Sequence, residues 1–276
     1  MKKLTIYNNV REHKTSPLVP VFNPCYPDGK PIPRSLWASN NWAGHSRVVI
    51  DWEEDNHFLT QHDHATTSVA DSRARAFAMV RECREAGVKT LGAYAWPWVR
   101  HPEDVERVVQ TNWPHVALLD WVCPSFYWYE ESVSDYQRKT ASTIAAIGQL
   151  SAGLRPFKVV PFLSIESMKK GSGARPLLDE EIVNQARAVA AIDSKLLGGV
   201  LVWSMLGRWK WLYDLYLRGS LKEGHAAWGE MKDAEEKMSL RGICTAPSKF
   251  EYSFARYLGV QILRVRRALA LVEAEG

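Results

Sequence analysis

The sequence predicts one α/β domain, built as a single TIM-like (β/α) barrel of parallel strands. Short β-rich runs recur along the chain with helical patterns between several of them, and this alternation is typical of a parallel sheet or barrel. The length of 276 residues suits one barrel core and makes a second domain unnecessary. We therefore expect residues 1–276 to form a single barrel domain.

Seven runs are predicted to be strands, at residues 4–8, 18–22, 47–53, 90–96, 116–126, 158–163 and 199–204. The first two are joined by a loop rather than a helix. The segment 23–44 is rich in Pro and Asn, which predicts a long irregular excursion before the third strand.

Helices are predicted where apolar residues recur at helical spacing, at residues 65–87, 135–150 and 178–192. Gly87 supplies a stop signal between the first of these helices and the strand that follows it. Beyond the last strand, residues 209–217 and 250–272 show the same spacing. We expect residues 206–276 to pack on the barrel as C-terminal helices.

The composition is that of an ordinary soluble globular protein, with 46% hydrophobic and 24% charged residues. The net charge of +4 arises from 35 basic and 31 acidic residues spread along the chain, so we expect no nucleic acid partner. We expect no membrane span, because no stretch of 18 apolar residues occurs. Residues 1–10 also lack the apolar core of a signal peptide, so a protein that stays in the cytoplasm or is released by lysis is expected.

The residue types that often bind metals give no convincing site. Three histidines and an aspartate cluster after the third strand, at His57, His62, Asp63 and His64. A third ligand at useful spacing is not evident, so we expect neither a metal nor another cofactor. The four cysteines are far apart and are compatible with two disulfides or with four thiols; they are Cys25, Cys83, Cys123 and Cys244.

Two acids end the third predicted strand. Asp51 and Glu53 are two residues apart, so both are expected to face the barrel mouth while Trp52 points to the other side. Like charges in one pocket raise the pKa of one member, which favours a proton donor beside an ionised partner. The pair is therefore a candidate for general acid catalysis, with a solvated loop as the simpler alternative.

Aromatic residues follow three other strand ends. The chain contains 12 Trp and 10 Tyr, most of which are expected to serve packing. Those at strand ends are candidates for substrate binding: Tyr94 and Trp96, Tyr127 and Tyr129, and Trp203. Acids ringed by aromatic side chains are typical of a pyranose site, because sugar faces stack on rings.

The sequence resembles the hyaluronidase family of glycoside hydrolases across residues 46–205. The resemblance is carried by short segments in one order, each at a strand end: Val49-Ile50-Asp51-Trp52-Glu53, Gly92-Ala93-Tyr94-Ala95-Trp96-Pro97, Pro124-Ser125-Phe126-Tyr127 and Gly199-Val200-Leu201-Val202-Trp203. Val159-Val160-Pro161-Phe162 resembles a fifth. The resemblance implies a barrel of seven strands and a polysaccharide or oligosaccharide substrate. The Arg-Pro pair that usually follows the family's acid strand is replaced here by Glu54-Asp55.

The resemblance also implies a mechanism. The N-acetyl carbonyl of the substrate attacks the anomeric carbon, so no enzyme nucleophile is needed. Glu53 would protonate the leaving oxygen, and Asp51 and Tyr127 would orient the acetamido group. Tyr94 and Trp203 would shape the subsite for that sugar. The expected substrate is a β-linked N-acetylhexosamine-containing polysaccharide that is hyaluronan- or chondroitin-like.

Two alternatives stay open at the level of the sequence. Glu166 follows the strand at 158–163, so a glycosidase could use Glu53 and Glu166 as two enzyme carboxylates on different strands. A solvated loop acid is the simpler interpretation of Glu166. The second alternative is a barrel that binds glycan without cleaving it. Asp120 and Trp121 lie early in their strand and are expected to serve wall packing or a buried hydrogen bond.

Overall fold

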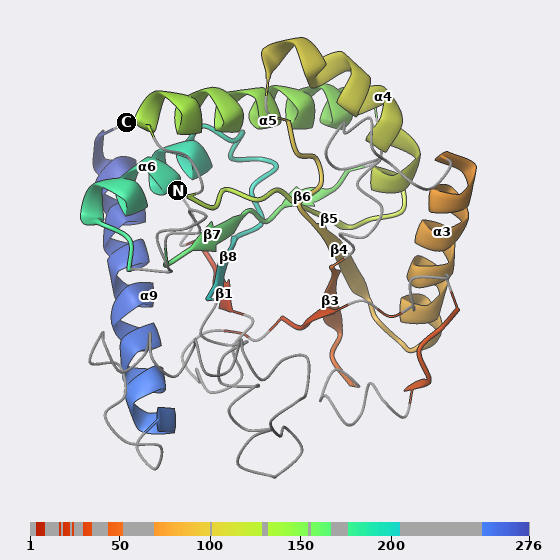
Figure 1. The fold of residues 1–276 in the computed structure, drawn as a ribbon, viewed down its shortest axis with the longest axis horizontal. Coiled ribbons are helices and arrows are strands. Elements are labelled where there is room, and N and C mark those ends of the chain that lie inside the picture. Colours follow the sequence, from red (N-terminus) through yellow and green to blue (C-terminus); the bar gives the residue numbers. More distant parts are fainter. Residues whose placement is uncertain are drawn as a thin grey trace, which may run out of the picture.

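The computed structural model describes residues 4–8, 17, 19–22, 24, 30–34, 44–51, 69–99, 101–128, 132–153, 156–166, 176–204 and 250–275. Parallel strands occupy the centre of the molecule and helices surround them on the outside (Figure 1). None of the helices in these ranges is long and apolar enough to cross a membrane.

The described strands form two parallel sheets. The larger sheet has the order β2-β3-β4-β5-β6, and its strands are Val21–Phe22, Arg47–Ile50, Thr90–Tyr94, Trp121–Cys123 and Lys158–Val159. The smaller sheet has the order β1-β8-β7, with strands Ile6–Asn8, Val200–Trp203 and Phe162–Ser164. All of the registered pairs are parallel, as the alternation of strands and helices predicts.

Backbone hydrogen bonds continue from one sheet to the other. Phe162 N–H donates to the carbonyl of Pro124 at 2.9 Å, so the exit of β5 pairs with β7 as well as β6. On the other side, Asn8 N–H donates to Pro17 O at 3.0 Å and Val19 N–H donates to Asn8 O at 2.9 Å. These bonds join β1 to the segment that leads into β2.

One predicted strand is divided in the structure. The run at 158–163 becomes β6 and β7, separated by Val160 and Pro161. Proline has no N–H to donate to a ladder, so the regular pairing stops there. The chain continues in the same direction, because Val160 N–H donates to Val122 O and Pro161 O accepts from Leu201 N–H, both at 2.9 Å.

Side chains alternate between the two faces of the strands. One buried group, here called the inner cluster, draws residues from every described strand except β6: Tyr7, Val19, Val49, Tyr94, Ala95, Trp121, Cys123, Tyr127, Val160, Phe162 and Leu201, with Val21 and Trp203 packed against it. The intervening residues face the helices, as Val48 and Ile50 do on β3. The period of two therefore separates an inner from an outer core.

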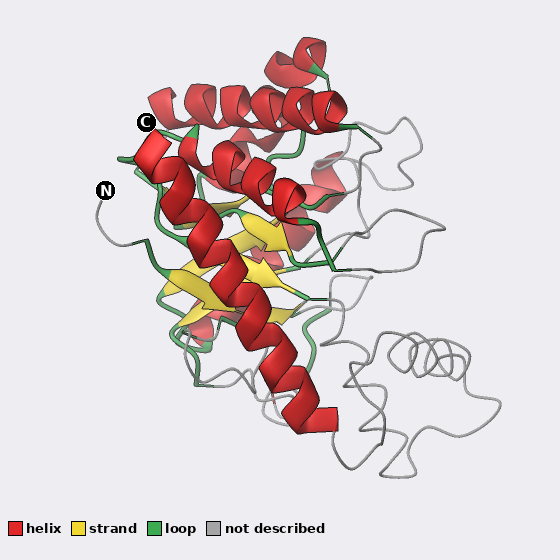
Figure 2. Cartoon of the chain, turned by 90° about the vertical axis from the view of Figure 1, so that its left-hand side faces the viewer, coloured by secondary structure: helices red, strands yellow, loops and turns green. Residues whose placement is uncertain are grey.

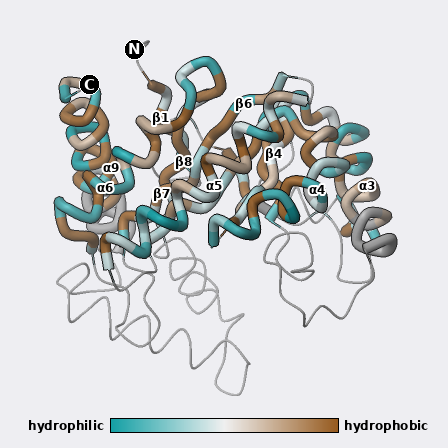
Figure 3. Tube along the Cα trace, turned by 90° about the horizontal axis from the view of Figure 1, so that it is seen from above, coloured by the Kyte–Doolittle hydropathy of each residue, from teal (hydrophilic) through white to brown (hydrophobic). Residues whose placement is uncertain are grey.

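The outer face is covered by amphipathic helices, whose bounds are Val69–Glu85 for α3, Val105–Val116 for α4, Val133–Gly153 for α5 and Asp179–Ala190 for α6. A 3₁₀ helix, η1, precedes α4 at Pro102–Asp104. Figure 3 shows the strands mainly in apolar colours and the helices with alternating polar and apolar positions. Helix α4 corrects the predicted strand at 116–126, because Val116 ends the helix and β5 begins at Trp121.

The long helix α9, Phe250–Glu275, packs on α6 and crosses in front of the strands in Figure 2. Apolar side chains on one stripe, such as Ile262 and Val265, are buried in the outer core. Arg264 fixes the contact, because its guanidinium donates to Asp179 Oδ1 at 2.6 Å and to Leu177 O at 2.7 Å. The predicted helix at 209–217 lies outside the described residues.

Gly92 on β4 faces the crowded interior. A Cβ atom placed there would lie 2.8 Å from Cys123 Sγ and 3.2 Å from Val49 Cγ2. We predict that Gly92→Ala lowers the free energy of unfolding by about 1–3 kcal/mol through overpacking. Gly148→Ala is the matched control, because nothing lies within 4 Å of its added Cβ on α5, and it should stabilise by roughly 0.5–1 kcal/mol. Denaturant titration measures both, and equal shifts in the two variants would contradict the packing argument.

Candidate active site

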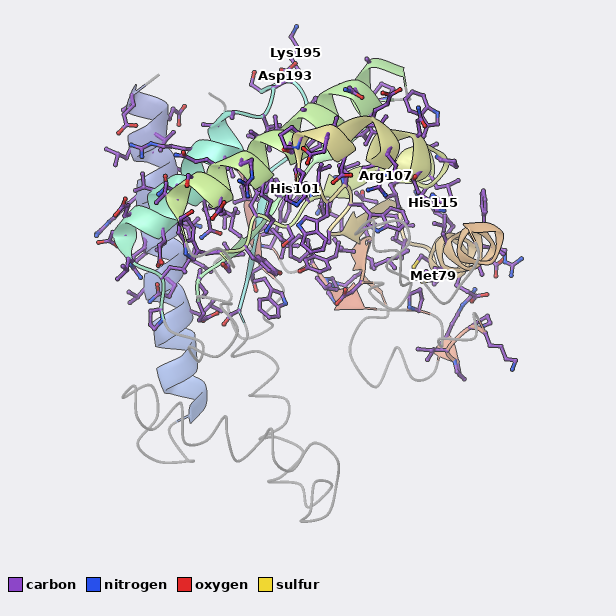
Figure 4. The ribbon with its side chains drawn as sticks, turned by 45° about the horizontal axis from the view of Figure 1, so that its top comes forward. Met79, His101, Arg107, His115, Asp193 and Lys195 are labelled. Atoms are coloured by element: carbon purple, nitrogen blue, oxygen red, sulfur yellow. The ribbon has the colours of Figure 1, made fainter. Side chains whose placement is uncertain are left out.

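The candidate site lies at the carboxyl ends of the strands. Asp51 directly follows β3, Tyr94 ends β4, and Trp203 ends β8. Tyr127 follows β5 and Glu166 follows β7. Because parallel strands present their carboxyl ends at the same edge, these five side chains belong to one end of the molecule. At the opposite end, the turn after α6 is closed by the hydrogen bond from Lys195 N–H to Asp193 Oδ1 at 2.8 Å; both residues project there in Figure 4.

Three of the predicted aromatic residues meet in the structure. The ring of Tyr127 lies 5.3 Å from that of Trp203, with the planes 29° apart, and 5.7 Å from that of Tyr94. Phe162 completes the group, with its ring 4.8 Å from that of Tyr94. Tyr94 and Tyr127 are buried, whereas Trp203 is half-buried. Trp203 is therefore the most exposed of these three rings, and it stacks on Tyr127, which in turn contacts Tyr94.

Trp96 lies elsewhere, so the prediction that it shares a face with Tyr94 is wrong. Ala95 has a φ of 59°, in the left-handed region, which interrupts the strand alternation after Tyr94. The Trp96 ring turns outward and contacts the ring of His115 edge-on at 5.3 Å. It lines a small apolar cavity between the strands and the outer helices, together with Met79 on α3; Figure 4 labels Met79 and His115 on this side.

Glu166 is buried rather than solvated, with 1% of its surface exposed. Ser204, itself 2% exposed, donates its hydroxyl to Glu166 Oε1 at 2.9 Å. A buried carboxyl group is costly unless hydrogen bonds compensate it, so the hydroxyl of Ser204 stabilises this acid. The expectation of a solvated loop acid is corrected, and the carboxyl group lies at the end of β7 beside the strand that carries Trp203.

Several predicted site residues lie outside the described part of the chain. These are Trp52, Glu53 and Tyr129. The histidine cluster after the third strand is outside it as well, and no group of metal-binding side chains occurs among the residues that the structure places. Asp51 is placed, and it is half-buried directly beyond β3. Val49, two residues before it, faces the inner cluster.

The remaining candidates have structural contacts. Asp120 accepts hydrogen bonds from Arg84 at 2.7 Å and from Leu91 N–H at 2.9 Å, so the predicted hydrogen bond is present but half-buried rather than buried. Trp121 packs in the inner cluster rather than in the outer wall. Cys83 and Cys123 are buried thiols, which rules out two disulfides, and burial raises the pKa of the Cys123 thiol well above its ordinary value. Cys123 is accordingly unsuited to act as a thiolate nucleophile.

Solved structures with a similar fold include two of bee venom hyaluronidase. One has a TM-score of 0.51 at 12% sequence identity and covers 78% of this chain and 98% of the hyaluronidase. The other, in complex with a hyaluronic acid tetramer, has a TM-score of 0.52 at 11% identity and covers 80% and 99% of the two chains. A scan against protein-family models and a search of curated protein sequences found no match. The chain thus shares the parallel α/β fold of these hyaluronidase structures.

The hydroxyl of Ser204 was not predicted to matter, since a serine at a strand end carries no distinctive signal. We predict that Ser204→Ala lowers the free energy of unfolding by about 1–3 kcal/mol, because it leaves a buried carboxyl oxygen with one donor fewer. Ser151→Ala is the control, since Ser151 makes an exposed hydrogen bond to Gly148 O at 2.8 Å. It should change stability by less than about 0.5 kcal/mol. Thermal and denaturant unfolding report both values, and a neutral Ser204→Ala would remove Ser204 as the support of Glu166.

Proposed function

We propose that the protein is a glycoside hydrolase that cleaves β-linked N-acetylhexosamine-containing polysaccharide of the hyaluronan or chondroitin type. The observation that carries the proposal is the contact of Tyr94, Tyr127 and Trp203 at strand ends that also bear Asp51 and Glu166. Rings beside carboxyl groups suit a sugar, which stacks its apolar face and bonds through its hydroxyls. The fold shared with bee venom hyaluronidase agrees with this reaction class.

The proposal includes a barrel of seven strands in which β6 and β7 count as one. The hydrogen bonds of Asn8 with Pro17 and Val19 support closure on one side. Those of Phe162 with Pro124 and Phe126 support it on the other. An inner cluster that gathers side chains from β1 to β8 also agrees with a closed barrel.

The proposed mechanism is substrate-assisted and retains configuration. The acetamido carbonyl oxygen forms a bond to the anomeric carbon while the glycosidic bond breaks, and Glu53 gives its proton to the leaving oxygen. A water molecule then gives a proton to Glu53, and its oxygen bonds to the anomeric carbon as the acetamido oxygen departs. Asp51 and Tyr127 orient the acetamido group, and Trp203 stacks on the sugar.

A second candidate mechanism uses Glu166 as the other enzyme carboxylate. Its burial and its bond to Ser204 favour this role, because a desolvated and oriented acid is what two-carboxylate catalysis requires. The strand that precedes Asp51 and the one that precedes Glu166 are three positions apart in the strand order β3-β4-β5-β6/β7. At about 4.8 Å for each neighbour, the two strands are roughly 14 Å apart along the curved sheet, so the two acids come from well-separated strands, as in two-carboxylate glycosidases.

The acid pair gives the first test of function. We expect Glu53→Gln to lower kcat by about 10²–10⁴-fold with binding retained, because the leaving oxygen is no longer protonated. Asp51→Asn should lower kcat similarly. A reducing-end assay on hyaluronan, chondroitin and chitin-type oligosaccharides measures turnover, and tryptophan fluorescence measures binding. Unchanged hydrolysis in Glu53→Gln would remove Glu53 from the acid role, whereas wild-type binding without cleavage would identify a glycan-binding barrel.

Product stereochemistry, the need for the N-acetyl group and the effect of Glu166→Gln together distinguish the two mechanisms. The substrate-assisted route releases the product with the anomeric configuration of the substrate, and it requires the N-acetyl group. Proton NMR of fresh hydrolysate reads the configuration, and a de-N-acetylated oligosaccharide should be cleaved far more slowly. We expect Glu166→Gln to retain turnover on this route. Inversion, together with equal cleavage of both substrates and loss of turnover in Glu166→Gln, would assign the reaction to Glu166 and its partner acid.

A further inference from the structure

We propose that Gln185, on the buried side of α6, is a positioning residue that holds Tyr127, the proposed acetamido-orienting residue, in place by fixing the end of β7, the strand that also leads to Glu166. Nothing in the predicted site required a residue from this helix. The inference rests on the proposed glycosidase function, since positioning matters only for a reaction or binding event at this end of the strands. It adds to that function by naming the contact that holds two of its strand ends together.

The contact is a two-point hydrogen bond to the backbone of β7. Gln185 Oε1 accepts from Ser164 N–H at 3.0 Å, and Gln185 Nε2 donates to Ser164 O at 3.0 Å. Gln185 is 1% exposed and Ser164 is fully buried, so both bonds are shielded from water. A carboxamide has one acceptor and one donor group at the spacing of a peptide, so it replaces a neighbouring strand at this residue.

Ser164 connects the two parts of the site. Its hydroxyl oxygen accepts the N–H of Trp128 at 3.2 Å, and Trp128 directly follows Tyr127. Along β7, Ser164 precedes Glu166 by two residues. A single side chain on α6 therefore fixes the backbone that carries Glu166 and, through the Ser164 hydroxyl, the exit of β5 that carries Tyr127.

The exit of β5 is held on its other side by α5. Tyr136 donates its phenol to Phe126 O at 3.0 Å, and its ring lies 4.6 Å from that of Trp128. The segment 126–128 thus lies between Tyr136 and Ser164. Loss of the Gln185 bonds leaves two buried backbone groups of Ser164 to find other partners, which requires the strand end to move. Misplacement by about 1 Å at a reacting group is enough to lower a rate about 100-fold.

The test compares matched variants of the full chain. Gln185→Met keeps the side-chain size and removes both bonds, while Gln185→Glu keeps the acceptor and removes the donor. Thr143→Val is the control, because buried Thr143 on α5 makes the same kind of pairing with Val99, accepting from its N–H at 3.2 Å and donating to its carbonyl at 3.3 Å. Val99 is not a residue of the candidate site.

With the best-cleaved oligosaccharide of the hyaluronan, chondroitin and chitin-type panel, we expect both Gln185 variants to lose about 10–100-fold in kcat while KM changes by less than about two-fold. Thr143→Val should keep kcat within about two-fold of wild type while its melting temperature falls as much as that of Gln185→Met. Wild-type kcat in both folded Gln185 variants, or equal kcat losses in Gln185→Met and Thr143→Val, would overturn the proposal.

If the wild-type protein cleaves nothing in the panel, the proposed function fails and the positioning role is judged by spectroscopy. Near-ultraviolet circular dichroism reports the packing of the aromatic side chains, including Tyr127 stacked on Trp203 and Trp128 packed on Tyr136. The signal should change in Gln185→Met and Gln185→Glu and stay that of wild type in Thr143→Val. An unchanged signal in the folded Gln185 variants rejects the positioning role independently of the reaction.

Discussion

The packing of the Tyr127 ring against three other aromatic rings is the interaction on which the candidate site depends. Its ring lies 5.3 Å from Trp203, 5.7 Å from Tyr94 and 6.3 Å from Phe162. These partners come from β8, β4 and β7, so one side chain joins strand ends that are distant in the sequence. Aromatic contacts bury large areas in preferred geometries, and they fix these ends relative to one another before a ligand arrives. A site formed on strand ends in this way is preorganised. Its side chains are held in place by the scaffold, so less conformational entropy is lost when a ligand binds.

The same end of the strands tolerates a group that works against stability. Glu166 is buried, and an apolar side chain of similar volume would avoid the cost of desolvating an acid. The structure instead supports it through the hydroxyl of Ser204 and through the backbone of Ser164, which Gln185 holds from α6. Functional sites often contain buried groups that destabilise the fold and are held in place by hydrogen bonds from neighbouring residues. The burial of Glu166 therefore supports the proposal that the candidate active site lies at the carboxyl ends of the strands.

Much of the fold could be predicted because it follows from periodicity. The alternation at Val48, Val49 and Ile50 and the helical spacing on α3 and α6 are local patterns, and the elements occur where these patterns lie. Helix α4 was missed although Val105, Val108 and Val109 have helical spacing, because Pro114 in its last turn argues against a helix. The position of Trp96 depends on the left-handed backbone at Ala95. Alanine rarely adopts this conformation, so the sequence does not predict it. Gln185 lies three residues after the buried Ile182, so its burial was visible in the spacing, but its partner on β7 was not.

The strand order is compatible with the proposed sugar site. Asp51 follows β3 and Glu166 follows β7, while the strand ends between them belong to β4 and β5 and carry Tyr94 and Tyr127. Three strand positions, at roughly 4.8 Å for each step, separate the strands that lead to the two acids by roughly 14 Å along the sheet, which leaves room for a pyranose ring between the strand ends. Trp203 enters from β8, next to Glu166, and stacks on Tyr127. The row of strands thus places aromatic surface between and beside two carboxyl groups, and the chain achieves this with only 12% identity to a hyaluronidase of the same fold.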